Sequence, residues 1–585
     1  MPKTSAYIHF PLYDISIKAD ATFSCNSVQP FSNPADLADF NICSKLATFE
    51  QDYWLLGGAN KLAPSTYSPG RVGLVTAEVS GSDGTFATDP ALTIVFGSSH
   101  TVDGVTLYFS ETDWASEATI YYYNASDVIL DTRTIYPTSR KYYDDLEGLA
   151  NVKKIVITFI KTNNPYRFIK LENIDFGRSL VFSGNELKRA TVIEEIDPTS
   201  IQCPTNSLEL EVVSSAELLS NAESAKNNGW AIDAYELVDN DSVYMGRFYL
   251  DEWEEATDLV VRLGCVDKLK ILGNVQYIGS AFYYPHESGS LYTVGGLIDN
   301  IAVNAGFDYS IDTDISATEF WSSAIYASSV RDALQKIALA TGAYVTCSRS
   351  ALVQIKKMEL ADGVVDSIIA SSDKGIGSKL KLRPLVTGVD VTSHHFNYQF
   401  ATSEDVIYQS YLENGTYYIV FESPTYEWTN NTGVTTATIS ISPPPGYNPG
   451  AGLYMGYKNF AIITVTSPGI VSLIGKYYIP NKIVHSISAA MSTGMTDNVI
   501  KIGNDEFVSR LLGQTAAQRI YDYYEQRYVQ ELKLYASLVS VGDKVRVDAK
   551  DSQYFYGIVE YMKTEMVGGF TSKVKAVGIV SDLIT

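Results

Sequence analysis

Four aromatic residues in the amino-terminal part of the chain are the side chains best suited to bind a ligand. They are Trp54, Tyr67, Trp114 and Tyr143. Aromatic rings of this kind combine a large apolar face with a polar edge, so they can stack on the face of a sugar. Packing in a core or against another subunit is the more common role of such residues. Both interpretations stay open on the sequence alone.

Patterns typical of catalysis or metal binding are absent from the sequence. None of the six histidines lies in an HExxH pattern, and the adjacent pair His394-His395 would point to opposite faces of a strand. The adjacent pairs Glu194-Glu195 and Glu254-Glu255 would also face apart on predicted strands, so neither is a catalytic carboxylate pair. No GxSxG, phosphate-binding loop or GxGxxG before a helix is present. We therefore expect no enzyme activity, no metal and no cofactor.

The charge and cysteine content narrow the choice of partners and compartment. A formal net charge of -23 repels a phosphate backbone, so we expect no sequence-specific nucleic-acid partner. The five cysteines are odd in number and scattered, which is not a disulfide framework and suits folding in a reducing cytoplasm. The first twenty residues do not resemble a signal peptide. No apolar window is long enough to predict a membrane span.

Length and composition predict several mainly β domains. At 585 residues, the length suggests about four domains. The chain has 41 tyrosines, nearly as many as the 44 lysines and arginines together. Tyrosine suits strands and contact surfaces, so this enrichment favours a β-rich, multidomain chain with extensive contacts.

The first 175 residues are predicted to form a joining strand and a β-sandwich. Residues 1–20 contain a strand-like run from Tyr7 to Ile15, which we expect to pair with a later part of the chain, since an exposed edge of this kind would aggregate. Residues 21–175 carry short apolar runs separated by turns, as in a sandwich. Residues 49–57, 102–109 and 166–177 resemble galactose-binding-like jelly-roll modules. This resemblance implies a jelly roll that binds glycan or is purely structural.

Residues 176–375 are predicted to form a β domain followed by a small α/β domain. Over 176–267, apolar and polar residues alternate in short runs, which indicates an antiparallel barrel or sandwich. Residues 268–375 contain the clearest helix, from Ser328 to Gly342, in which Ser328 or Ser329 can cap the start and Gly342 ends the helix.

The rest of the chain is predicted to form a second, interrupted barrel. Its strands come from residues 376–400 and 481–585, and a long helix is expected over 505–532, where apolar residues recur at four-residue steps. A meander of strands closes the barrel. Residues 401–480 are turn-rich and contain the proline tract from Pro443 to Gly450, so we interpret them as a β-rich insertion.

The order of these pieces resembles the tail hub proteins of bacteriophages and of related contractile particles. The resemblance covers residues 176–585 and depends on the order of several segments, none of which is diagnostic alone. The segments are Phe182–Leu187, Glu194–Pro198, Asn206–Glu211, Gly246–Leu250, Gly542–Val547 and Gly568–Val574.

The hub resemblance implies a fold and a role. It implies two hub-type β-barrels with a small α/β insert between them, and the jelly-roll β-sandwich is added near the amino terminus. Three copies would form a ring in the distal tail or baseplate of a virion made in the host cytoplasm. The implied partners are the tail tube, the tail-tip or spike protein, and host cell-surface glycan.

Two other functions stay open at this stage. The first is a carbohydrate-binding adhesion protein of the tail tip that acts through the jelly roll. The second is a tail-associated peptidoglycan hydrolase whose site has no familiar sequence pattern. The sequence does not distinguish a contractile from a non-contractile tail.

Overall fold

The computed structural model is mainly β, with several sheets, which confirms the expected fold class. The chain folds into two compact units: unit 1 comprises residues 1–190 and 209–265, and unit 2 comprises residues 191–208 and 266–585. The structure describes residues 4–581 except 41–42, 44–45, 49, 51–60, 71, 201, 239–240, 278–281, 284–291, 321–322, 326–328, 362, 371–372, 376, 401–402, 443–459, 489–496, 504, 536–538, 549–552 and 569–570.

One sheet of unit 1 contains the amino-terminal strand. Its order is β11-β1-β14-β15-β16-β13-β12, and β1 is antiparallel to both of its neighbours. Ala6, Ile8 and Phe10 alternate into the core, which explains why this segment forms a strand. The elements are β1 (Thr4–Pro11), α1 (Ser16–Ala19), β11 (Ser179–Ser183), η2 (Gly184–Glu186), β12 (Leu187–Glu195), β13 (Ser207–Val213), α2 (Ala216–Asn228), β14 (Ala231–Val238), β15 (Asp241–Thr257) and β16 (Val260–Val266).

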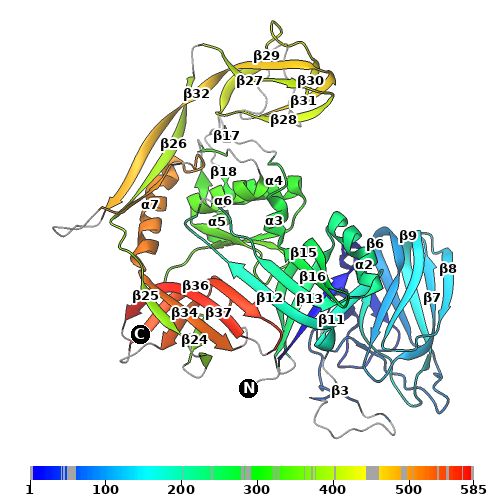
Figure 1. The fold of residues 1–585 in the computed structure, drawn as a ribbon. Coiled ribbons are helices and arrows are strands. Elements are labelled where there is room, and N and C mark those ends of the chain that lie inside the picture. Colours follow the sequence, from blue (N-terminus) through cyan, green and yellow to red (C-terminus); the bar gives the residue numbers. More distant parts are fainter. Residues whose placement is uncertain are drawn as a thin grey trace. The chain divides into compact units, whose positions relative to one another are not determined.

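Helix α2 lies against strand β15 (Figure 1). The Ser215 hydroxyl caps the helix start by accepting a hydrogen bond from the Leu218 backbone N–H. Gly229 ends it in the left-handed conformation, with φ of 62°. The buried face of the helix consists of Leu218, Ala222 and Ala225, whose spacing is that of one helical stripe.

The second part of unit 1 is a β module with its own apolar core. Its strands are ordered β5-β10-β6-β9-β7-β8, and β2 also pairs with β6. The long strands β6 and β9 pair along most of their length, with several irregularities in register (Figure 1). The elements are β2 (Ala21–Cys25), η1 (Pro34–Ala38), β3 (Leu46–Ala47), β4 (Lys61–Leu62), β5 (Leu74–Val75), β6 (Ala91–Phe109), β7 (Ala115–Tyr123), β8 (Ile129–Ile135), β9 (Lys141–Thr162) and β10 (Lys170–Asp175).

Unit 2 begins with a small α/β domain. The helix predicted between Ser328 and Gly342 is confirmed as α6: Ser329 caps its start, and Gly342 ends it at φ of 87°. The elements are α3 (Lys268–Leu272), β17 (Phe282–Tyr283), β18 (Tyr292–Thr293), α4 (Val294–Ala305), β19 (Tyr309–Ile311), α5 (Thr313–Ser316), β20 (Glu319–Phe320), β21 (Ser323–Ala324), α6 (Val330–Thr341), β22 (Ala343–Thr346) and β23 (Val353–Lys357).

The carboxy-terminal strands of unit 2 curl around a second core, which includes Leu534, Val545, Phe555 and Val574. They pair in the order β24-β35-β36-β37-β34-β25, and the end of β12 also pairs with β36. Strand β24 pairs with β35, and the segment that follows it reaches β34, where Lys374 forms an antiparallel β-bridge with Leu534. The strands are β24 (Ser367–Ile369), β25 (Lys379–Leu382), β34 (Tyr528–Tyr535), β35 (Lys544–Asp548), β36 (Tyr554–Glu565) and β37 (Thr571–Ser581).

The long helix expected over 505–532 is shorter than predicted. Helix α7 spans Arg510–Glu525 and packs on α6 and β26 (Figure 1). Residues from Tyr528 onward form strand β34, in which Leu532 and Leu534 alternate into the core. Apolar residues recur at four-residue steps through both α7 and β34, which explains why the predicted helix is too long. The alternation of apolar and polar residues within β34 is the pattern that indicates a strand.

The remaining strands of unit 2 form a β-rich segment that extends from β26 and β32. Their core includes Phe421, Trp428, Ile463 and Leu473. The proline tract of residues 443–450 lies outside the described residues. The strands are β26 (Gly388–Phe400), β27 (Asp405–Leu412), β28 (Gly415–Val420), β29 (Thr425–Asn430), β30 (Thr438–Ser442), β31 (Phe460–Ser467), β32 (Gly469–Ser488) and β33 (Val499–Ile502).

Candidate functional sites

Three of the four aromatic residues proposed to contact glycan, Tyr67, Trp114 and Tyr143, lie in the described part of the chain, and each keeps accessible side-chain surface. Tyr67 is exposed, and its hydroxyl donates a hydrogen bond to Oδ1 of Asp36 over 2.5 Å. Trp114 is half-buried and packs against the core of the module. Trp54 lies outside the described residues. No contact joins Tyr67 to Trp114 in the part of the chain that the structure describes.

The fourth aromatic residue, Tyr143, is already engaged within unit 1. Its hydroxyl donates a hydrogen bond to the backbone oxygen of Asp103 over 2.9 Å. The guanidinium carbon of Arg178 lies 4.9 Å from the centre of the tyrosine ring. Burial and the negative charge of Asp145 raise the pKa of Tyr143 to about 12. A glycan would therefore share this ring with Arg178.

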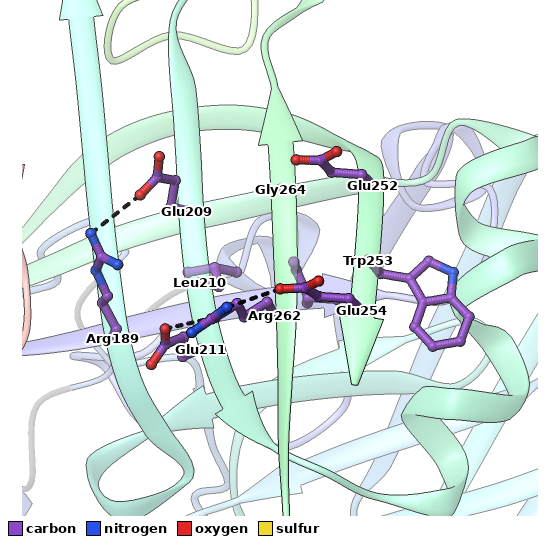
Figure 2. A pocket seen from close by; sticks show the side chains of 10 residues that line it. Arg189, Glu209, Leu210, Glu211, Glu252, Trp253, Glu254, Arg262 and Gly264 are labelled. Carbon is purple, nitrogen blue, oxygen red and sulfur yellow. Dashed lines mark hydrogen bonds and ion pairs between the residues drawn. The ribbon is translucent and has the colours of Figure 1, made fainter. Parts of the chain in front are cut away.

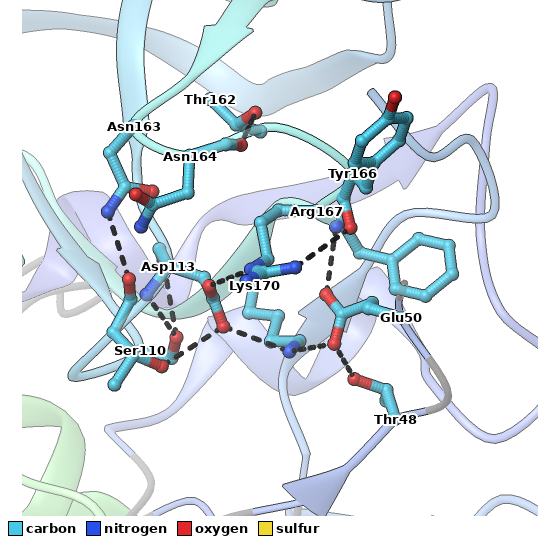
Figure 3. Close-up of polar contacts among 12 residues, drawn as sticks. Thr48, Glu50, Ser110, Asp113, Thr162, Asn163, Asn164, Tyr166, Arg167 and Lys170 are labelled. Carbon is cyan, nitrogen blue, oxygen red and sulfur yellow. Dashed lines mark hydrogen bonds and ion pairs between the residues drawn. The ribbon is translucent and has the colours of Figure 1, made fainter. Parts of the chain in front are cut away.

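A network of buried charges fixes the loops at one end of the module (Figure 3). Nζ of Lys170 lies 2.8 Å from Glu50 and 3.1 Å from Asp113, and Nε of Arg167 lies 3.3 Å from Asp113. Thr48 donates a further hydrogen bond to Glu50. Two carboxylates and two cations balance one another here, so this network is built to hold the loops together.

A second buried network joins the amino-terminal strand to the end of the module. The carboxylate of Asp175 accepts hydrogen bonds from Tyr13 and Lys18 and lies 2.9 Å from Nε2 of His9. The same imidazole nitrogen lies 3.0 Å from the Ser179 hydroxyl. Asp175 is fully buried, and Lys18 together with His9 holds its pKa well below the usual range, against the effect of burial. Apart from the position of Asp175 at a predicted domain boundary, no sequence pattern indicates this network.

The outer face of the unit 1 sheet carries an array of ion pairs around a hollow of about 300 Å³ (Figure 2). Nε of Arg262 lies 3.0 Å from Oε1 of Glu211, and Nη1 of the same guanidinium lies 3.0 Å from Oε1 of Glu254. Arg189 and Glu209 form a third pair at 3.3 Å. All three arginine–glutamate contacts are substantially exposed to solvent. Exposed pairs of this kind contribute little to the stability of the fold.

Two further residues shape the same hollow. The Glu252 side chain lies over Gly264, where a Cβ atom would come within 2.7 Å of its Cγ. Trp253 turns away from the ion pairs, and its indole N–H donates to Glu223 of α2 over 3.4 Å (Figure 2). The hollow is therefore lined mainly by charged side chains, with a surplus of carboxylates.

Two buried aspartates in unit 2 have strongly shifted titration. Asp267 accepts hydrogen bonds from the backbone N–H groups of Asn206 and Lys270, and Asp505 accepts one from that of Phe507. Burial raises the pKa of both carboxyls to about 7. Each carboxyl accepts hydrogen bonds from nearby backbone N–H groups, and among the described residues neither belongs to a group of potential metal ligands.

Two features common in other proteins are not found among the described residues. No group of three or more histidine, cysteine, aspartate or glutamate side chains is placed to hold a metal ion there. Within the same residues, no helix has the length and apolar character needed to cross a membrane.

Comparison with known proteins found similarity to solved structures alone, since no family model and no curated protein matches the sequence. The 43 kDa tail protein of prophage MuSo2 from Shewanella oneidensis shares 10% identity at a TM-score of 0.38, covering 68% of this chain and 96% of that chain. The tail protein of Neisseria meningitidis MC58 shares 6% identity at a TM-score of 0.40, and the similarity covers 68% of this chain and 93% of that protein.

A third similarity covers a smaller part of the chain. A fucose-binding module from Streptococcus pneumoniae shares 16% identity at a TM-score of 0.18, covering 27% of this chain and 93% of that module. All three TM-scores lie below 0.5, so no residue role or activity is transferred from these proteins.

Proposed function

We propose that this chain is a non-enzymatic structural protein of a phage or phage-like tail, and that it acts as the hub of the distal tail or baseplate. In this role three copies form a ring that connects the tail tube to the tail tip, spike or receptor-binding parts. The ordered segments that resemble hub proteins support this proposal. Four of these segments include residues of strands β11, β12, β13 and β15.

The observation that carries the proposal is the uncovered edge strand β25. Among the described residues it pairs with β34 alone, and all four residues of β25 are exposed, including Leu380 and Leu382. An exposed apolar edge strand tends to pair with other chains, and natural proteins cover such an edge or close it in a symmetric assembly. A ring of three copies would cover β25 with a neighbouring subunit.

The ion-paired face of the unit 1 sheet supports the same role. Arg189 and Arg262, with their glutamate partners, present alternating charges of both signs on an exposed surface. Such a surface favours one register and orientation of a partner chain, because like charges repel in the others. We propose that this face contacts a neighbouring tail protein.

Mass measurement with electron imaging tests the proposal. Light scattering of the purified chain should give a mass near three times 64.3 kDa, and negative-stain images should show rings. A labelled antibody fragment should mark the distal end of intact particles. A protein that stays monomeric at high concentration and labels no tail would contradict the hub role.

Glycan binding by the β module is a separate proposal, favoured by the accessible surface of Tyr67 and Trp114. Binding to a glycan array that is lost in Trp54→Ala and Trp114→Ala would support it. Cell-wall clearing by the purified chain would instead indicate a hydrolase.

A further inference from the structure

Unit 1 contains a second hollow, of about 380 Å³, where the connection from β1 to α1 meets the end of α2 and the strand β15. Its lining includes none of Tyr67, Trp114 and Tyr143. Its volume is in the range of small-molecule binding pockets. The residues that shape it are Tyr13, Asp14, Asn228, Gly229, Trp230 and Tyr249.

The half-buried Trp230 and Tyr249 supply the accessible aromatic surface of this hollow, and the Tyr13 side chain that also lines it is buried. The Tyr13 hydroxyl donates to Asp175 over 2.9 Å, and Gly177 packs so closely on Tyr13 that a Cβ atom there would lie 2.8 Å from the tyrosine Cβ. The backbone N–H of Trp230 donates to Ala225 over 3.0 Å, directly after the left-handed Gly229. The Tyr13 ring and the Trp230 backbone are therefore fixed before a ligand binds, which lowers the entropy cost of binding.

Two polar side chains stand beside these rings. The backbone N–H of Ser16 donates to Oδ1 of Asp14 over 2.9 Å, which orients the exposed carboxylate. Asn228, the last residue of α2, is exposed and offers both a carbonyl oxygen and an amide N–H₂ group. The hollow thus combines apolar faces with one acceptor group and one group that both donates and accepts.

We propose that this hollow binds one sugar residue of a neutral glycan. A pyranose ring has an apolar face of C–H groups for the aromatic walls, and hydroxyl groups that donate to Asp14 and exchange hydrogen bonds with Asn228. Asp14 is the only ionised side chain among the lining residues, and its charge disfavours phosphates and acidic sugars. A quaternary ammonium ion would also suit aromatic walls and a carboxylate, but it makes no use of the Asn228 amide.

Saturation-transfer NMR on the full chain tests this site directly. The probes are the methyl glycosides of glucose, galactose, mannose, rhamnose and N-acetylglucosamine, with choline chloride as the cationic alternative. We expect transfer to at least one glycoside, reduced about tenfold in Trp230→Ala and in Asn228→Ala, since each change removes one part of the site.

Matched controls separate loss of the site from loss of the fold. Trp253→Ala removes another half-buried tryptophan of unit 1 and should leave the signal unchanged. Asn228 is exposed at a helix end, so its alanine variant should unfold at the wild-type temperature even if Trp230→Ala does not fold. Transfer to none of the five glycosides, transfer unchanged in Asn228→Ala, or binding of choline alone would overturn the proposal.

Discussion

His9 and Asp175, 166 positions apart in the chain, meet in the interior of unit 1 with Nε2 2.9 Å from Oδ2. His9 belongs to β1, which enters the sheet, and Asp175 ends β10, the last strand of the β module. Tyr13 and Lys18 donate to the same carboxylate. One buried side chain therefore joins three parts of the chain.

We expect Asp175→Asn to destabilise the protein by about 3–5 kcal/mol, because Lys18 would stay buried without its anionic partner. Urea unfolding at pH 7 measures this loss. Asp145→Asn is the matched control: it removes an exposed pair with Arg178 and should cost less than about 1 kcal/mol. Equal losses in the two variants would contradict a special role for Asp175.

Asp175 also contributes to the loss of folding stability at acid pH. The pKa of Asp175 is lowered in the folded state, so its stabilising effect is present above the unfolded pKa, near 4, and is lost as the pH falls toward the folded value. Stability measured from pH 5 down to pH 2 should therefore decline less steeply in Asp175→Asn than in the wild type. An unchanged slope would refute this contribution.

Asp505 should have the opposite effect on pH dependence. Burial raises its pKa to about 7, so stability is greatest below the unfolded pKa, near 4, and is lost as the pH rises through 7. We expect Asp505→Asn to reduce the fall in urea midpoint between pH 5 and pH 8, since asparagine can still accept from the Phe507 N–H. Asp314→Asn, at an exposed pair with Lys357, should keep the wild-type fall. Identical falls in all three proteins would exclude this role for Asp505.

The pairing of β36 with β37 depends on two facing glycines. Gly557 lies opposite Gly578, and a Cβ atom at Gly578 would lie 1.8 Å from the Tyr556 carbonyl oxygen. Gly578→Ala must therefore shift one strand, and we expect a loss of about 1–3 kcal/mol or more in thermal unfolding. Gly433→Ala has its nearest neighbour at 3.6 Å and should change stability by less than about 0.5 kcal/mol. A wild-type melting curve for Gly578→Ala would show that the strands adjust freely.

The proposed ring makes strand β25 sensitive to charge. Leu380 is 45% exposed and Leu382 is 55% exposed, so Leu380→Asp with Leu382→Asp should leave the isolated fold intact. A neighbouring subunit would have to bury these carboxylates, so we expect the trimer to dissociate in light scattering. Val303→Asp, at a position that is 81% exposed on α4, should keep the trimer. If the double variant stays trimeric, β25 does not form part of the subunit interface.

Elements with local signals could be predicted from the sequence. Helix α6 has a capping serine, an apolar stripe and a terminal glycine within fifteen residues, and its bounds were nearly correct. No glycine or proline lies between the end of helix α7 at Glu525 and the start of β34 at Tyr528, so no local signal marks this boundary. Alternation of Leu532 and Leu534 was the only indication, and it competed with the helical spacing.

The binding surfaces were harder to predict, because their residues come from distant segments. Tyr13 and Trp230 line one hollow, yet Tyr13 follows strand β1 and Trp230 follows helix α2, and the two carry no shared motif. Trp114 and Tyr143 stood out as aromatic residues in a predicted sandwich, but sequence cannot show that Arg178 lies over Tyr143. Which distant residues become neighbours depends on the chain topology, and a single sequence does not determine that topology.

The adjacency of Leu12 and Arg178 has a consequence for how this chain can change. Leu12 follows β1, Arg178 precedes β11, and the backbone N–H of Leu12 donates to the Arg178 oxygen over 2.8 Å. The chain thus leaves the sheet and returns to it at one point, with the whole β module between. A short turn could take its place without altering the strand order. We therefore expect that the module can be exchanged as a unit, so that its surface diversifies while the sheet that carries it stays constant.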